Sequence, residues 1–250
     1  MLIVVTGLDG SGTSSIAKEL SKLDHNSVVV KTPSPEYKDR NYIDDVVRKE
    51  SSVAHMLYYL SSTVFASDYI RNNLDYTNNN VYVVRYLIDT VVSNRVAGIP
   101  LELNYNLYGN QLLEPDLTLF IDLEEHQRQN RINTRGKSIL DEVLDKDDTR
   151  EKFLSEFQRL LIPEKTIYVD NSKPLEYVVN KTYKELKVYN EKFLAENRKI
   201  ELKGDIFTKN DIDSISYKAL IKNRQKDLKS SKILIKKYDN YAGGKGNKVW

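Results

Sequence analysis

Nine residues near the start of the chain, GLDGSGTSS at positions 7–15, have the spacing of a phosphate-binding loop. Gly7, Gly12 and Ser14 are in register with the pattern G-x-x-x-x-G-K-[ST], in which backbone N–H groups surround phosphates and the lysine reaches the terminal ones. The lysine position holds Thr13. The sequence therefore predicts a polyphosphate site that lacks its usual positive charge.

The loop lies in the context that such a site needs. An apolar run, LIVVT at 2–6, precedes it, and apolar residues at helical spacing follow it at 15–23. A strand, a glycine-rich turn and a helix in this order present N–H groups and a helix dipole to an anion. We expect Ser14 to offer its hydroxyl to Mg²⁺ and the phosphates to contact Gly7, Gly10, Ser11, Gly12, Thr13, Ser14 and Ser15. A purely structural glycine turn is the alternative interpretation.

Thr13 leaves three interpretations open. A threonine hydroxyl donates one hydrogen bond but brings no charge, and loss of one preorganised donor commonly lowers a rate about 10²- to 10³-fold. Either another cation of the protein replaces the lysine, or the protein binds phosphate without transferring it efficiently, or the site performs a different chemistry.

The composition of the 250-residue chain excludes several classes of protein. A chain without cysteine forms neither disulfides nor thiolate metal sites, and its three histidines lack the spacing of a zinc or iron site. No run reaches the roughly 18 apolar residues of a membrane span, and a strand-like run from Leu2 leaves no room for a signal peptide. We therefore expect a cytoplasmic protein.

Positive charge is concentrated toward the C-terminal end. Residues 201–250 contain 12 Lys and Arg against six Asp and Glu, whereas the preceding 200 residues are net acidic. We expect one domain at 1–200 and a basic extension at 201–250. Such an extension is a solvated tail, a contact with another protomer, or a binding segment for a polyanion such as nucleic acid.

Strand and helix patterns alternate along the chain. Helical patterns separate five apolar runs that predict strands, at 2–6, 27–31, 81–86, 117–123 and 166–170. Strands that are apolar on both faces form a parallel sheet covered on two sides, so we expect a three-layer α/β fold. Ligands bind at the carboxyl ends of such strands. Arg85, near the end of the third run, is therefore expected to contact the ligand.

Six segments in this order resemble the thymidylate kinase family of P-loop nucleoside monophosphate kinases, over about residues 1–190. The segments are GLDGSG at 7–12, FASDY at 65–69, VRY at 84–86, EPDLTLFIDL at 114–123, NRINTRG at 130–136 and YVDNSKPLEYVV at 168–179. The resemblance implies the P-loop fold, ATP as phosphoryl donor, Mg²⁺ as cofactor, a deoxypyrimidine monophosphate such as dTMP as acceptor, and a homodimer.

The resemblance also implies roles for individual residues. Asp9 would orient the acceptor, Arg85 would clamp its phosphate and Phe65 would stack on its base. The other assignments place Tyr69 and Asn94 at the acceptor base, Lys173 beside the donor adenine, and Arg131, Arg135 and Lys137 in a lid over the donor phosphates. Structural roles are the alternatives: a turn for Asp9, the core for Phe65 and a solvated loop for Arg135 and Lys137.

Three positions depart from the family pattern. Thr13 replaces the loop lysine, Val84 replaces an aspartate that helps to hold the water around Mg²⁺, and Tyr69 replaces an arginine near the acceptor base. These departures leave two interpretations. In the first, the protein is a kinase in which Arg135 or Lys137 of the lid replaces the loop lysine. In the second, it is a catalytically degenerate protein that acts through its basic extension. A nucleoside in place of the monophosphate is a further interpretation.

Overall fold

The computed structural model describes residues 1–106, 112–137, 141 and 144–202. Five parallel strands form one sheet in the order β2-β3-β1-β4-β5. The strands are β1 (Leu2–Thr6), β2 (Val28–Lys31), β3 (Val81–Val84), β4 (Leu117–Asp122) and β5 (Thr166–Asp170). The predicted α/β fold with five parallel strands is confirmed.

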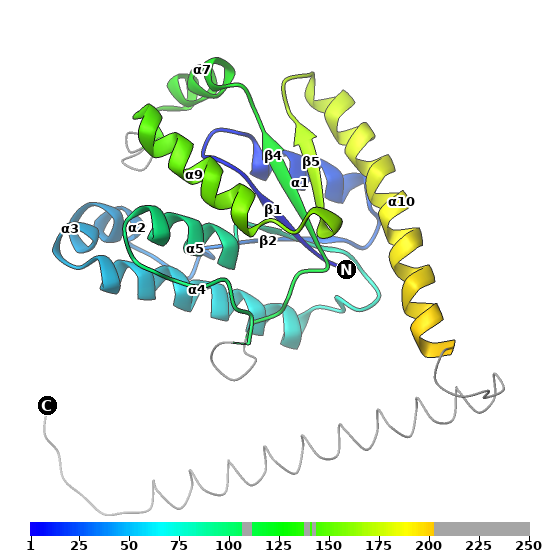
Figure 1. Ribbon diagram of the computed structural model, residues 1–250. Coiled ribbons are helices and arrows are strands. Elements are labelled where there is room, and N and C mark those ends of the chain that lie inside the picture. Colours follow the sequence, from blue (N-terminus) through cyan, green and yellow to red (C-terminus); the bar gives the residue numbers. More distant parts are fainter. Residues whose placement is uncertain (107–111, 138–140, 142–143, 203–250) are drawn as a thin grey trace, which may run out of the picture. The chain divides into compact units, whose positions relative to one another are not determined.

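Helices connect the strands (Figure 1). Their bounds are α1 (Thr13–Leu23), α2 (Arg40–Tyr42), α3 (Arg48–Glu50), α4 (Ser52–Asn73), α5 (Leu87–Val96), α7 (Glu125–Arg135), α9 (Asp147–Leu160) and α10 (Leu175–Leu202). A π-helical turn, Ile43–Val47, lies between α2 and α3, and a 3₁₀ turn, Pro163–Lys165, precedes β5. The sequence patterns predicted the longer helices but not the short turns between β2 and α4.

Alternating side chains of the strands build a core on each face of the sheet. Leu2 and Val4 of β1 belong to a cluster that also contains Leu87 of α5 and Phe157 of α9. Ile3, which is completely buried, points to the opposite face. Helices α4, α5 and α9 cover the first face, and α1 and the part of α10 up to Val188 lie on the other (Figure 1). The central strands β1, β3 and β4 are therefore buried on both sides, which explains their continuous apolar runs, whereas the edge strands β2 and β5 are partly exposed.

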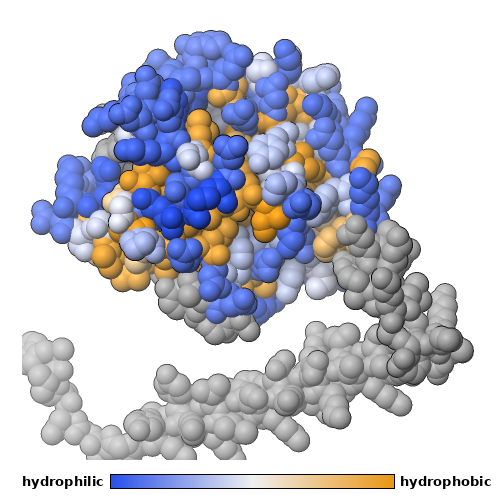
Figure 2. Space-filling view, viewed as in Figure 1, coloured by the Kyte–Doolittle hydropathy of each residue, from blue (hydrophilic) through white to orange (hydrophobic). Residues whose placement is uncertain are grey.

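The face of the molecule in Figure 2 carries hydrophilic side chains with hydrophobic ones between them. Val46, Val53 and Leu57, in the segment that leads into α4 and along its first turns, are exposed apolar residues. The expected homodimer stays a prediction.

Within the described residues, no helix is both long and apolar enough to cross a membrane.

The first compact unit of the chain comprises Met1–Val188. The predicted basic extension at 201–250 lies outside the described residues except for the last two residues of α10. Its proposed roles therefore stay predictions.

Candidate active site

The phosphate loop connects β1 to α1 at the carboxyl end of the sheet. Gly12, with a φ of 100°, forms the left-handed turn at which α1 begins, and residues with a β-carbon disfavour that conformation. Its carbonyl accepts hydrogen bonds from the N–H groups of Ser15 and Ile16, at 3.1 and 3.0 Å. Because the first N–H groups of a helix have no carbonyl partner inside it, the start of α1 is suited to a phosphate.

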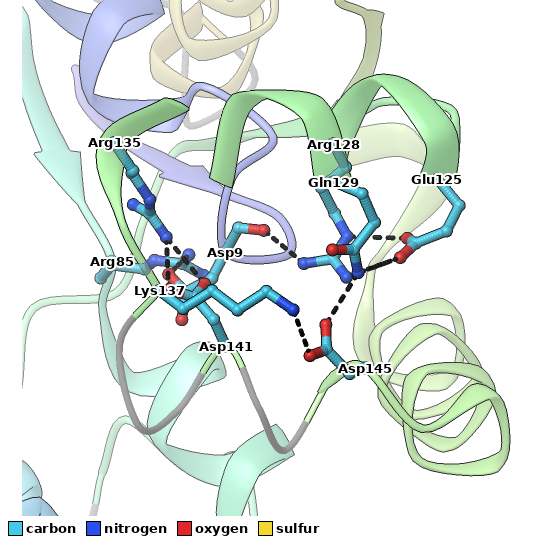
Figure 3. A network of polar contacts seen from close by, with 9 residues as sticks. All are labelled: Asp9, Arg85, Glu125, Arg128, Gln129, Arg135, Lys137, Asp141 and Asp145. Carbon is cyan, nitrogen blue, oxygen red and sulfur yellow. Dashed lines mark hydrogen bonds and ion pairs between the residues drawn. The ribbon is translucent and has the colours of Figure 1, made fainter. Parts of the chain in front are cut away.

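A buried arginine of α7 anchors the loop. Arg128 has no exposed surface, and its Nη1 donates to the carbonyl of Asp9 at 2.9 Å. Its Nε and Nη2 each donate to the carboxylate of Glu125 at 2.7 Å (Figure 3). The side chains of Arg128 and Ile132 also occupy the space that a β-carbon on Gly10 would enter. Helix α7 therefore fixes the shape of the loop.

A second anchor holds the loop from the end of β5. Asn171, which is buried, donates from its amide to the carbonyl of Ser11 at 2.7 Å. Arg131 of α7 donates to the same carbonyl at 3.2 Å and to the carbonyl of Asn171 at 2.9 Å. The loop is thus tied to β5 and α7 at the residue that precedes Gly12.

Arg85 follows β3 and lies between two carboxylates. Its backbone has a positive φ of 66°. Its Nη2 donates to Asp9 at 2.7 Å, and its Nη1 donates to Asp89 at 2.7 Å and to the carbonyl of Gly7. Burial alone would lower the pKa of Arg85, but the charges of Asp9 and Asp89 outweigh this effect and raise the pKa. The guanidinium therefore carries a permanent charge beside the phosphate loop.

Two clefts open next to the loop. The phosphate cleft, about 540 Å³ in volume, is lined by Gly10 and Gly12, by the first three residues of α1, and by the cations Lys31, Arg40, Arg85, Arg131 and Arg135. The aromatic cleft, about 140 Å³ in volume, is lined by Tyr59, Tyr86, Phe153 and Phe157 together with the polar residues His55, Asp89, Thr90 and Ser93. Asp9, Thr32 and Arg85 line both clefts. The two clefts therefore meet at the ion pair of Asp9 and Arg85.

The sequence profile of the thymidylate kinase family matches residues 5–182 of the chain, which include the phosphate loop, Arg85 and α7. The chain belongs to the thymidylate kinase family. The thymidylate kinase of Brachyspira hyodysenteriae is 29% identical to it over 141 residues, which are 52% of this chain and 67% of that protein. A probable thymidylate kinase of Archaeoglobus fulgidus is 28% identical over 183 residues, 71% of this chain and 90% of that protein.

Solved structures share the fold. The structure of a thymidylate kinase from Candida albicans superimposes with a TM-score of 0.56 at 19% identity, and the match covers 76% of this chain and 92% of that one. The structure of a deoxyadenosine kinase from M. mycoides with bound dATP has a TM-score of 0.58 at 19% identity, covering 75% of this chain and all of that one. The family fold is thus shared with both proteins.

Most of the predicted phosphate-binding residues of this thymidylate kinase family member come together in the phosphate cleft. Thr13 is nearly buried at the start of α1, and Ser14 and Ser15 beside it are exposed. Gly7 lines the aromatic cleft instead, and the hydroxyl of Ser11 is buried beneath the loop. Val84, at the family's aspartate position, contributes an apolar side chain to the wall of the phosphate cleft.

Of the three predicted lid cations, Arg131 bonds the backbone carbonyls of Ser11 and Asn171, whereas the other two pair with carboxylates that follow them in the chain. Arg135 donates from Nη2 to both oxygens of Asp141, at 2.7 and 2.9 Å, and Lys137 donates to Asp145 at 2.8 Å (Figure 3). Arg135 lines the phosphate cleft, whereas Lys137 is not among the residues that line it. Lys173, predicted beside the adenine, is exposed in the turn before α10. A role for Arg135 at the phosphates would require it to leave Asp141.

The structure does not bring the residues predicted at the acceptor base, Phe65, Tyr69 and Asn94, to either cleft. Phe65 and Tyr69 are exposed on α4, and the ring of Phe65 contacts Tyr37 at a centroid distance of 5.8 Å. Asn94 is buried and donates to the carbonyl of Thr90 at 2.8 Å, an ordinary contact within α5. The aromatic residue that α4 contributes to the aromatic cleft is Tyr59, less than two turns before Phe65. The segment FASDY at 65–69 therefore did not predict which turn of α4 lines the cleft.

A polar cluster around Tyr59 was not expected from the sequence. The hydroxyl of Tyr59 donates to Oδ1 of Asp44 at 2.6 Å and accepts a hydrogen bond from Nε of Arg40 at 3.0 Å. His55 Nε2 lies 3.0 Å from the same carboxylate oxygen. Burial would raise the pKa of Asp44, but the bonds to His55 and Tyr59 and the charge of Arg40 lower it. The π-helical turn that carries Asp44 therefore links Arg40 of the phosphate cleft to Tyr59 of the aromatic cleft.

The pair of Glu125 and Arg128 makes the stability of this family member depend on pH. Burial would raise the pKa of Glu125, but hydrogen bonds from Arg128 and Gln129 outweigh burial and lower it. A carboxylate with a lowered pKa in the folded state stabilises the fold above the unfolded value of about 4.3 and loses that contribution as the pH falls. The difference in free energy of unfolding between the wild type and Glu125→Gln should therefore decrease from pH 6 toward pH 3 in urea titrations. A difference that stays constant would contradict the assignment.

Proposed function

We propose that this chain is a P-loop nucleotide kinase that transfers the γ-phosphoryl group of ATP to a deoxypyrimidine monophosphate such as dTMP. The observation that carries the proposal is the junction of the two clefts at Asp9 and Arg85. A donor bound by the phosphate loop and an acceptor bound among aromatic side chains would meet at this junction. Such an arrangement supplies the positioning on which phosphoryl transfer depends.

Residues at the junction have complementary roles in the proposal. Arg85 would neutralise charge that spreads over the transferred group, and Asp9 would orient the acceptor oxygen. Tyr59 and Phe153 would hold the acceptor base between apolar surfaces, a contact that any base can make. Thr90 and Ser93 add hydroxyl groups to the same cleft, where they can distinguish one base edge from another.

The phosphate cleft fits a Mg²⁺ ion that arrives with the nucleotide. No three acidic, histidine or cysteine side chains among the described residues form a metal site by themselves. Mg²⁺ in kinases needs few protein ligands because phosphate oxygens and water supply the others. Ser14, exposed in the cleft, would hold the ion, which would neutralise phosphate charge when bound.

A nucleoside is a second candidate acceptor. Arg85 already pairs with Asp9 and Asp89, each at 2.7 Å, so two carboxylates accompany one guanidinium at the junction. This surplus of negative charge disfavours a second phosphate and suits a neutral hydroxyl whose proton a carboxylate can accept. One structural neighbour is a deoxyadenosine kinase, which is consistent with this candidate.

Phosphoryl transfer from Mg²⁺-ATP to a panel of deoxynucleoside monophosphates and deoxynucleosides tests the proposal. Turnover fastest with dTMP or another deoxypyrimidine monophosphate would support it, and turnover with nucleosides alone would favour the second candidate. Absence of turnover with every acceptor, in protein that binds ATP, would instead favour a nucleotide-binding protein that acts through residues 201–250.

The role of Arg85 leads to a prediction for the conservative variant Arg85→Lys. We expect kcat/KM to fall about 10²-fold, because lysine keeps one charge but cannot bond Asp9 and Asp89 with a fixed fork of donors. Arg95→Lys is a matched control. Arg95 also pairs with two carboxylates, Glu102 and Glu156, and its side chain is 23% exposed, as is that of Arg85. Equal losses in the two variants would show that Arg85 has only a structural role.

A further inference from the structure

Because the loop lysine is missing, the start of α1 lacks the positive charge that would balance the phosphates. Thr13 lines the phosphate cleft at the first residue of α1 and brings no charge to it. The nucleotide proposed for this cleft carries several negative charges, which helix N–H groups alone balance only in part. One of the cations that line the cleft is therefore expected to replace the lysine.

Four of these five cations already have partners. Arg85 pairs with Asp9 and Asp89, and Arg131 donates to the carbonyls of Ser11 and Asn171. Arg135 pairs with Asp141, and Arg40 bonds the hydroxyl of Tyr59 and lies 3.4 Å from Asp44. Each would have to give up a contact, or share it, in order to bind a phosphate.

Lys31 is the exception among the described residues that line the cleft. It is exposed at the end of β2, and no contact of its ammonium group with another described residue is observed. A lysine ammonium is a compact point charge with three donors, the same group that the usual phosphate loop supplies.

The pleat of β2 places Lys31 on the face of the sheet on which α1 lies. Val30 belongs to the core cluster on the face covered by α4, α5 and α9, so Lys31, the next residue, lies on the other face. Helix α1 contacts β2 and begins with Thr13, Ser14 and Ser15. Lys31 also pairs in register with Val84, which itself lines the phosphate cleft. The fold therefore places Lys31 across the cleft from the start of α1.

We propose that Lys31 replaces the loop lysine by contacting the β- and γ-phosphates of the donor nucleotide. The inference rests on the proposed function in that it takes ATP as the occupant of the phosphate cleft. The charge would then come from the edge strand of the sheet, and Thr13 would add only a hydroxyl.

Binding of adenine nucleotides to the full chain tests this inference without any acceptor. We expect Lys31→Met, which keeps most of the aliphatic stem, to weaken the affinity for Mg²⁺-ATP and Mg²⁺-ADP about 10- to 100-fold in calorimetry, the usual effect of losing a charge-assisted hydrogen bond. The affinity for AMP, which has neither phosphate, should change less than about twofold. Lys18→Met serves as the control, because Lys18 is exposed on α1 and does not line either cleft.

A second variant makes the test specific to the missing charge. Adding Thr13→Lys to Lys31→Met should restore much of the lost ATP affinity, since the charge returns at the usual loop position. ATP affinity of Lys31→Met within twofold of the wild type, or an equal loss of AMP affinity, would overturn the inference. Loss of ATP affinity in Lys31→Met together with no turnover on any acceptor would retain Lys31 as a phosphate ligand and reject the proposed kinase.

Discussion

Arg128→Met is expected to lower the free energy of unfolding by about 3 kcal/mol, because it removes every hydrogen bond of a buried guanidinium and leaves the carbonyl of Asp9 without this donor. Arg128 is completely buried and donates three hydrogen bonds, two to Glu125 and one to the carbonyl of Asp9. Methionine fills much of the space of the aliphatic stem, so the loss reflects mainly the broken hydrogen bonds to the Asp9 carbonyl and to Glu125, which is 31% exposed and keeps its bond from Gln129. Urea unfolding followed by circular dichroism measures the change.

Arg159→Met provides a matched control for this prediction. Arg159 pairs with Glu156 at the same spacing of three residues, but its side chain is 46% exposed, whereas that of Arg128 has no exposed surface. An exposed ion pair contributes little, so we expect a cost below about 0.5 kcal/mol. Arg128→Met should also weaken ATP binding, because the loop loses the donor that holds Asp9. Equal stability losses in the two variants would refute the anchoring role of Arg128.

Gly7→Ala is expected to destabilise the fold by about 3–5 kcal/mol, the combined cost of a strained backbone and an overpacked core. A β-carbon on Gly7 would overlap with the carbonyl oxygen of Ile121 and would lie 2.8 Å from the hydroxyl of Ser11, and Gly7 has a φ of +149°. Because the Ile121 carbonyl belongs to β4, relief of the clash requires movement of a central strand or of the phosphate loop. ATP affinity should therefore fall along with stability.

Gly136→Ala separates the cost of the strained backbone from the cost of the overpacked core. Gly136 also has a positive φ, +89°, but no atom of the described residues lies within 4 Å of the position that its β-carbon would occupy. Only the backbone cost applies there, and we expect a loss of about 1 kcal/mol. Thermal and urea denaturation of the two variants measure both losses of stability. A loss for Gly7→Ala as small as that for Gly136→Ala would show that the close approach of the loop to β4 is relaxed in solution.

The sequence predicted features whose causes are local. Five apolar runs indicated five parallel strands, of which the structure buries β1, β3 and β4, and the phosphate loop was identified from the spacing of Gly7, Gly12 and Ser14. Arg85 was expected to contact ligand because it follows a buried strand, and it lies where the two clefts meet. The parallel sheet and the position of Arg85 could be predicted because the order of strand and helix and the carboxyl edge of a sheet follow from pattern alone, and ligand contact by Arg85 stays a prediction.

Contacts between distant segments could not be predicted in the same way. Arg128 follows Glu125 by three residues, so in the sequence the two residues look like a surface ion pair. The fold nevertheless buries Arg128 beneath Asp9. Asn171 was passed over because its partner, the carbonyl of Ser11, is 160 residues away. Residue types do not encode such pairings, which depend on where α7 and β5 pack against the loop.

By itself, the sequence determined the layers of the fold, the phosphate loop, the absence of its lysine and the resemblance to thymidylate kinases. Only the tertiary structure decided which side chains line the clefts: Tyr59 rather than Phe65 on α4, and Lys31 on the edge strand β2. The physical reason is that periodicity defines a face of a helix or strand, whereas packing between elements decides which turn of that face borders a cleft. The tertiary structure likewise decided that Arg135 and Lys137 face carboxylates of their own segment, whereas Lys31 of β2 faces the phosphate cleft.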